Sequence, residues 1–464
     1  MRRAALLLAA ALAAASVAAA PATAQGGRCL LVLENVDRQG VKEETSAGTN
    51  YYAGGNVRLR CRDTAVRMSS DSVAVFGGNV ARFIGTVRYA DSTLEVTADT
   101  GTYYKDGERW EARGRVTARN LSTGSALQGP SLDYLRAATG LRDTSELWAV
   151  RRPTIRYTGR DSAGTAGEPY VIVAERVRLR GDEQVWAGGR VTVDRSDFAA
   201  RGDSLWLDTG PRGEGLLLGS PLMKGLGTDT FTLTGQRIDL RLEGREVTYV
   251  TATTKARAVT PDWNLSADSI ALDVADDEVE QTLAWGGAVE ATGREYAVRG
   301  DSLAIDTPAQ RLRGLRAYGA AWMGGEVDSA SRERDWLAGD TVAAVFASRD
   351  TADTGAAVLQ RMSAAGAARA YHRIADDGGG APSLSYVRGT QIVVLMKAPA
   401  VGGNEEVERV VVRGQVDGVQ LAPTRERGTT APPATPPAAV PGDTLRPAPG
   451  RRPAPAPVSD GGRR

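Results

Sequence analysis

The 464-residue sequence contains one histidine, two cysteines and only 6% aromatic residues. This inventory excludes a zinc site built from histidine and cysteine, and it excludes a cluster of catalytic imidazoles. The formal net charge is +1, which lacks the basic character of a nucleic-acid-binding protein. No lysine is followed by serine or threonine, so the chain has no Walker A phosphate-binding loop. We therefore expect no metal, no cofactor and no nucleotide hydrolysis by the chain itself.

The two ends of the chain differ in composition from its middle. Arg2 and Arg3 precede an apolar run at 4–20, and Ala22-Thr23-Ala24 follows as a small-residue cleavage pattern. Residues 1–24 are therefore expected to be a signal peptide that directs the protein to the periplasm, with possible outer-membrane association left open. Residues 423–464 contain 11 of the 21 prolines, which is typical of a disordered tail.

The only two cysteines, Cys29 and Cys61, are candidates for a disulfide in an oxidising compartment. Two unpaired buried thiols are the alternative. Cys29 falls in residues 25–50, which we interpret as an N-terminal strand and loop segment.

An eight-residue motif recurs ten times across residues 51–422. Its pattern is apolar, any, small, Asp, Ser or Thr, apolar, any, apolar, and clear copies begin at Met68, Ala200, Leu265 and Val298. Each copy is followed by a second apolar segment near Gly-x-Val, such as Gly85-Thr86-Val87. With 54 glycines and turn signals between the halves, each unit is typical of strand, turn, strand.

Two columns of the motif, two and four residues after the Asp, are mostly apolar and share one strand face. The residue between them, for example Ala271 beside Leu272, is expected to face solvent. The residue three positions before the Asp is also apolar. It lies five residues before the first of these columns, and residues an odd number apart point to opposite faces of a straight strand. A bulge or bend at the small-Asp-Ser step resolves this conflict.

The pattern therefore predicts an all-β protein, an elongated β-jellyroll of stacked, V-shaped antiparallel strands around an apolar interior. A parallel β-helix with one coil per unit is the alternative. Trp110, Trp148 and Trp186 precede the Gly-x-Val segments and are expected to cover the edge of the core.

The recurring Ala/Gly-Asp-Ser-apolar-x-apolar strand with its Gly-x-Val partner resembles the OstA-like (organic solvent tolerance N-terminal) repeats of lipopolysaccharide-transport proteins. The resemblance spans about Tyr51 to Leu421 and depends on repeat rhythm. It implies a β-jellyroll whose apolar groove holds acyl chains. It also implies lipopolysaccharide or a similar glycolipid as ligand, and other transport proteins as partners through end-to-end strand addition.

The residues expected to line the groove come from the two apolar columns, and each could equally be ordinary core: Val73, Val75, Leu205, Leu207, Ile238, Leu240, Ile270, Leu272, Leu303 and Ile305. A structural or adhesive β-solenoid and a carbohydrate-active β-helix enzyme are the other functions considered. The acidic pairs Asp276/Asp277 and Asp376/Asp377 favour the enzyme only weakly, because both occur in loop-like sequence. His372 has no metal partner in the sequence. We therefore expect a protein that is not an enzyme and that has no catalytic residues.

Overall fold

The computed structural model describes residues 29–423, except 47, 159–167, 197, 211, 227–229, 244–245, 262, 276–277, 294–295, 326–332, 348–357, 375–381 and 398–405. The expected signal peptide, the tail from residue 424 onward and both acidic pairs lie outside the described residues. The described chain is almost entirely β-strand, with one short 3-10 helix at Pro308–Gln310.

The strands, in chain order, are β1 (Leu30–Asn35), β2 (Arg38–Thr45), β3 (Gly48–Arg62), β4 (Arg67–Phe76), β5 (Val80–Ala90), β6 (Leu94–Tyr104), β7 (Arg109–Asn120), β8 (Ala126–Leu135), β9 (Glu146–Val150), β10 (Thr154–Tyr157), β11 (Tyr170–Val173), β12 (Arg176–Arg180), β13 (Gln184–Asp194), β14 (Phe198–Asp208), β15 (Arg212–Leu218), β16 (Leu222–Gly225), β17 (Thr232–Thr234), β18 (Arg237–Glu243), β19 (Glu246–Val259), β20 (Trp263–Ala275), β21 (Glu278–Gly293), β22 (Ala297–Asp306), β23 (Gly314–Gly324), β24 (Trp336–Ala347), β25 (Val358–Ile374), β26 (Ser383–Lys397), β27 (Glu406–Arg413) and β28 (Asp417–Leu421).

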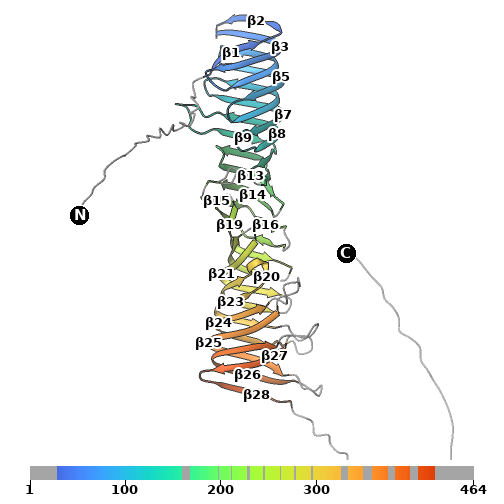
Figure 1. Ribbon diagram of the computed structural model, residues 1–464, viewed down its shortest axis with the longest axis vertical. Helices are drawn as coiled ribbons and strands as arrows, with labels where there is room; N and C mark the ends of the chain where they lie inside the picture. The colour runs from blue at the N-terminus through green and yellow to red at the C-terminus, as the bar shows by residue number, and fades with distance from the viewer. Residues whose placement is uncertain are drawn as a thin grey trace, which may run out of the picture.

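The strands stack in sequence order into a long column, with β2 at one end and β28 at the other (Figure 1). Neighbouring strands run antiparallel, as in β4 with β5, β13 with β14 and β25 with β26. A parallel β-helix would pair each coil with its neighbours in parallel, so this alternative is wrong. The expected elongated all-β, jellyroll-like fold is confirmed.

The long strands are bent into two arms, and elsewhere two short strands supply one arm each; we call such a two-armed unit a rung. In β14, Phe198–Arg201 pair with β16 while Ser204–Asp208 pair with β15, so β15 and β16 are the two arms of one rung. We call the arm before the motif Asp the A arm and the arm after it the B arm. The line where the free tips of the two arms face each other is called the seam.

The bend occurs where one acidic residue faces two residues with left-handed backbone. Thr253 pairs with Ser269 and Ala256 with Ala267, so Asp268 alone faces Thr254 and Lys255. Both of these residues have positive φ, of 63° and 56°. The phase slip thus lies at the predicted step, but the extra residue belongs to the partner strand. A bulge of this kind turns the chain and moves apolar side chains back to the inner face.

In most units a glycine is the first residue of this bulge, as in Gly85-Thr86-Val87 and Gly319-Ala320-Ala321, and it lies against the side chain at the motif Asp position. Gly319 has φ of 72°, and a Cβ placed on it would lie 2.1 Å from Asp301 Oδ2. Three units lack the acid, at Pro130, Gln236 and Thr390. The first two also lack the glycine, because Arg151-Arg152 and Thr254-Lys255 take the left-handed positions, whereas the third keeps Gly414 against Thr390. The glycine is therefore found where a side chain, usually the acid, occupies the space that a Cβ would need.

The inner faces of both arms form one continuous hydrophobic core. The residue two positions after the motif Asp is buried in all ten copies. Two sequence expectations were wrong. Ala271 points outward but is only 1% exposed, because it pairs between the larger Thr251 and Leu283. Trp110 lies inside the core, stacked on Tyr89 with ring centroids 4.9 Å apart, instead of at its edge.

Candidate functional site: the interior and the seam

The ten residues expected to line a groove all face the common interior. Seven are buried, and three are partly buried and pack against the core, namely Val75, Leu240 and Ile305. The structure brings them together along the length of the column rather than at one point. Their arrangement offers an apolar surface that repeats from rung to rung, without a charged side chain in the two columns that form it.

An apolar cavity opens in this interior between β10 and β19. Its volume is about 40 Å³, and Leu205, Leu207, Ile238 and Leu240 of the expected set contribute to its wall. Tyr170 and Phe198 close it on the A-arm side, with ring centroids 5.8 Å apart. This volume accommodates only a few water-sized groups. An acyl chain can therefore enter only if the arms move apart and neighbouring side chains repack.

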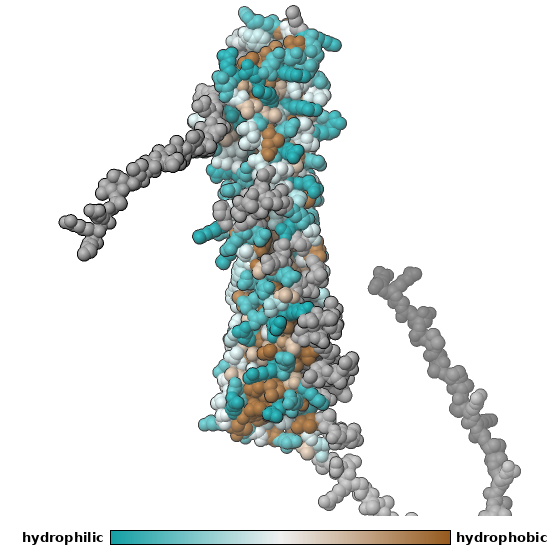
Figure 2. Space-filling view, in the orientation of Figure 1, coloured by the Kyte–Doolittle hydropathy of each residue, from teal (hydrophilic) through white to brown (hydrophobic). Residues whose placement is uncertain are grey.

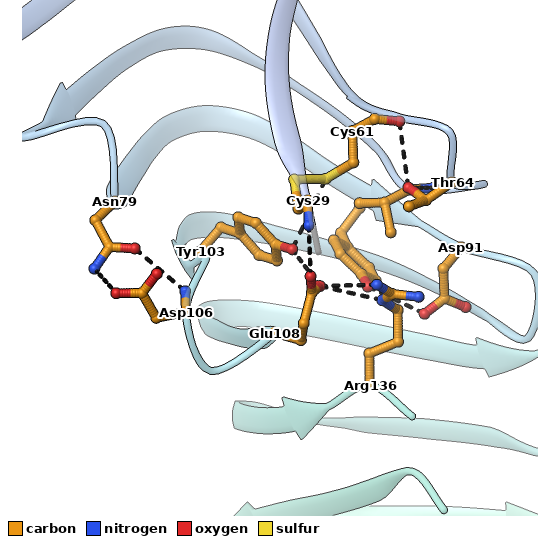
Figure 3. Close-up of a disulfide and its surroundings, with 11 residues drawn as sticks. Cys29, Cys61, Thr64, Asn79, Asp91, Tyr103, Asp106, Glu108 and Arg136 are labelled. Atoms are coloured by element: carbon orange, nitrogen blue, oxygen red, sulfur yellow. Dashed lines mark hydrogen bonds and ion pairs between the residues drawn. A yellow bond between two sulfur atoms is a disulfide. The ribbon is translucent and has the colours of Figure 1, made fainter. Parts of the chain in front are cut away.

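Near the β1 end, the seam is closed by a buried polar cluster centred on Glu108 (Figure 3). Glu108 lies in the B-arm turn between β6 and β7. Its carboxylate accepts hydrogen bonds from Tyr103 Oη at 2.5 Å and from the backbone N–H of Cys29 at 2.8 Å. Arg136 Nη2 forms an ion pair with it at 2.9 Å. Because Cys29 belongs to the A arm, this cluster joins the two arms.

The disulfide holds the A-arm side of this cluster in place. Cys29 and Cys61 are bonded to each other, so the expected partners are paired. Cys61 lies in β3. This strand pairs with β1, which begins directly after Cys29. The bond therefore fixes the start of the described chain beside Glu108. Removing a disulfide of this kind generally weakens a fold by about 2–4 kcal/mol.

A second buried carboxylate, Asp91, also closes the seam. It lies in the A-arm turn between β5 and β6, and accepts hydrogen bonds from Tyr89 Oη at 3.0 Å and Tyr134 Oη at 2.9 Å. Its other oxygen accepts the backbone N–H groups of Thr93 and Leu94, both at 2.8 Å. Tyr134 belongs to the B arm, so this contact also crosses the seam.

These buried tyrosines predict a loss of stability at alkaline pH. Burial raises the pKa of Tyr89, Tyr103 and Tyr134 above the ordinary value of 10.0. Below pH 10 both the folded and the unfolded chain keep these protons. Above it the unfolded chain releases them first, so the free energy of unfolding should fall by up to about 4 kcal/mol per pH unit. Unfolding followed by tyrosinate absorbance between pH 9 and about 12 measures this slope.

Matched variants distinguish the ionisation of the buried tyrosines from general alkaline denaturation. Tyr134→Phe should make the decline shallower, because one of the three ionisations is removed. Tyr51→Phe should leave the slope unchanged, since Tyr51 is 48% exposed. If all 13 tyrosines of the folded protein ionise together near pH 10, the explanation is wrong.

A third contact across the seam is centred on Asp182, in the B-arm turn between β12 and β13. Its carboxylate accepts hydrogen bonds from Asn120 Nδ2 at 2.7 Å and from Ser122 Oγ at 2.9 Å. Tyr157, at the A-arm tip of β10, donates to the Asp182 carbonyl at 2.6 Å and contacts Thr209 Oγ1 at 2.7 Å. The three contacts, at Glu108, Asp91 and Asp182, were missed by the sequence analysis because they lie in turns outside the repeated columns.

The remaining candidates occupy ordinary structural positions. His372 Nδ1 lies 2.7 Å from Asp335 Oδ2, and Arg373 Nε also bonds this carboxylate at 2.9 Å. Although burial opposes it, these two partners hold the pKa of Asp335 below its ordinary value. Trp148 and Trp186 enclose the Arg178 guanidinium, 5.4 and 5.1 Å from their ring centroids.

Within the part of the chain that the structure describes, no group of three or more His, Cys, Asp or Glu side chains is arranged to hold a metal ion. The described residues also contain no helix with the length and apolar character needed to span a bilayer. A scan against protein-family models finds no match for this chain, and a search of curated proteins finds none either.

Proposed function

We propose that the protein is a non-enzymatic carrier that holds the acyl chains of lipopolysaccharide, or of a similar glycolipid, between its two arms. In this proposal it acts in the periplasm and conducts its cargo toward the outer membrane. The observation that supports it most is the apolar interior, which runs through the rungs and contains a cavity beside Leu205, Leu207, Ile238 and Leu240.

The physical basis is the transfer of hydrocarbon from water. Each CH₂ group that moves into the interior contributes about 0.8 kcal/mol. Because the same apolar columns recur in successive rungs, neighbouring positions along the column offer similar environments. A lipid could then shift from one rung to the next without meeting a deep minimum. Opening the seam would be the main cost of loading.

The two ends of the column differ in how readily they could pair with a strand of another protein. The edge strand β2 has exposed charges at Lys42, Glu43 and Glu44, which discourage strand pairing. At the other end, Val407, Val410, Val419 and Leu421 are exposed on β27 and β28, and Figure 2 shows hydrophobic side chains gathered near that end. We infer that another transport protein adds a strand at the β27/β28 end.

Photo-crosslinking tests the cargo. A benzoylphenylalanine at Leu240, which is half-buried and lines the cavity, should capture glycolipid roughly tenfold more than one at its neighbour Arg241, which is exposed. The two positions are adjacent on β18 and differ only in the face to which they point. Equal capture at both positions, or capture at neither, would overturn the proposal.

A further inference from the structure

A second, larger pocket lies in the mouth of the seam between β7 and β13. Its volume is about 260 Å³, close to the lower end of the usual range for small-molecule sites, about 300–1,000 Å³. Its walls come from the tips of both arms, with Asn120 and Ser125 on the A-arm side and Thr144 and Gln184 on the B-arm side. Opening and closing of the seam at this level would therefore change its shape directly.

The pocket is divided into an apolar floor and a polar rim. Leu94, Leu127, Leu147 and Ile155 form much of the floor and continue the hydrophobic core. Tyr157 lines both this pocket and the apolar cavity, so its ring separates the two spaces. A ligand with one apolar chain and one polar group would fit this division. The chain would lie over the floor toward Tyr157, and the polar group would remain in the rim.

The rim decides which polar group is suitable. Its charged side chains are the carboxylates of Asp143 and Asp182, and none of the residues that the structure places in the lining is basic. Carboxylate and carboxamide oxygens accept hydrogen bonds from hydroxyl groups, and Thr144 and Ser145 add hydroxyls that can donate or accept. A phosphodiester or sulfate group has no donor to offer and would be repelled. Asp143 and Asp182 are both exposed, so water screens their attraction for a cation, and a quaternary ammonium group has no hydrogen-bond donor to offer them.

We propose that this pocket binds a single-chain amphiphile with an uncharged, polyhydroxylated head group, such as an alkyl glycoside. The assignment does not depend on the proposed transport of lipopolysaccharide, because it concerns a different opening and a head group without phosphate. Asp182 positions the rim of the site, and the contact between Tyr157 and the Asp182 carbonyl closes its inner end.

Calorimetric titration with octyl glucoside, kept below its micelle-forming concentration, tests the site. The wild-type protein should bind it saturably, while octyl sulfate and octyltrimethylammonium of the same chain length should bind at least about fivefold more weakly. Ala137→Trp places an indole in the pocket and should weaken glucoside binding at least about tenfold. Ala343→Trp, on the outer face of β24, is the matched control and should leave binding unchanged.

Asp143→Asn gives a readout that does not depend on how well the tryptophan variant folds. It should raise the affinity for octyl sulfate relative to that for octyl glucoside about threefold, because one repelling charge is removed while an amide oxygen remains to accept a hydroxyl. The assignment is overturned if wild type does not bind the glucoside, if Ala137→Trp binds it normally, or if either charged amphiphile binds as tightly. Crosslinking of glycolipid at Leu240 with no glucoside binding would reject this site alone, and the reverse result would reject only the lipid carrier.

Discussion

Replacing Arg136 by methionine should lower the free energy of unfolding by about 3–5 kcal/mol, because it leaves the buried Glu108 carboxylate without its ion-pair partner. The Glu108 side chain is 1% exposed and that of Arg136 is 13% exposed, so water cannot replace the lost partner. Although burial opposes it, Glu108 holds the pKa of Arg136 above its ordinary value, so the arginine is charged in the folded protein. Urea unfolding measures the loss.

The double variant Glu108→Gln/Arg136→Met provides the control. It removes both charges and keeps an amide oxygen to accept the Cys29 N–H, so it should recover more than half of the lost stability. Hydrogen exchange should locate the effect of the single variant in β1 and β3–β8, because rungs far along the column contact only their own neighbours. A double variant as unstable as Arg136→Met would contradict the buried-charge explanation.

Replacing Gly319 by alanine should cost about 2–4 kcal/mol, since the new Cβ meets two penalties at once. The residue has φ of 72°, and the Cβ would lie 2.1 Å from Asp301 Oδ2 and 2.8 Å from Asp301 Cβ. Aspartate is too short to move away while Gly300 and Ser302 on either side of it stay paired. The expected result is a lower urea midpoint, with hydrogen-exchange protection lost first in β22–β24.

Two variants separate the backbone penalty from the steric one. Gly78→Ala places the Cβ in open space at φ of 67°, so it should cost only about 1 kcal/mol. In Gly319→Ala/Asp301→Ala the carboxylate is absent but a Cβ remains 2.8 Å away, so the loss should fall between those of Gly78→Ala and Gly319→Ala. If Gly78→Ala and Gly319→Ala are equally destabilising, the acid plays no steric part in the bend.

The bend shows which features of this fold a local sequence pattern can predict. Apolar residues on both sides of the small-Asp-Ser step required a phase slip, and this needed no knowledge of neighbouring rungs. The partner that supplies the extra residue could not be inferred, because Gly319 and Asp301 meet only after adjacent strands pair in register. Ala271 illustrates the same limit, since its burial depends on the size of the residues that pair beside it.

Alternation of apolar side chains, the recurring acid and the glycine after it together determined that this chain forms bent strands around an apolar interior. These signals are local, and they repeat, so each copy supports the others. Only the tertiary structure decided where the seam is closed and where it opens. The contact of Cys29 with Glu108 spans 79 residues, and that of Asn120 with Asp182 spans 62. Such contacts depend on which turns the stacking brings face to face, and single residues in turns leave no periodic signal in the sequence.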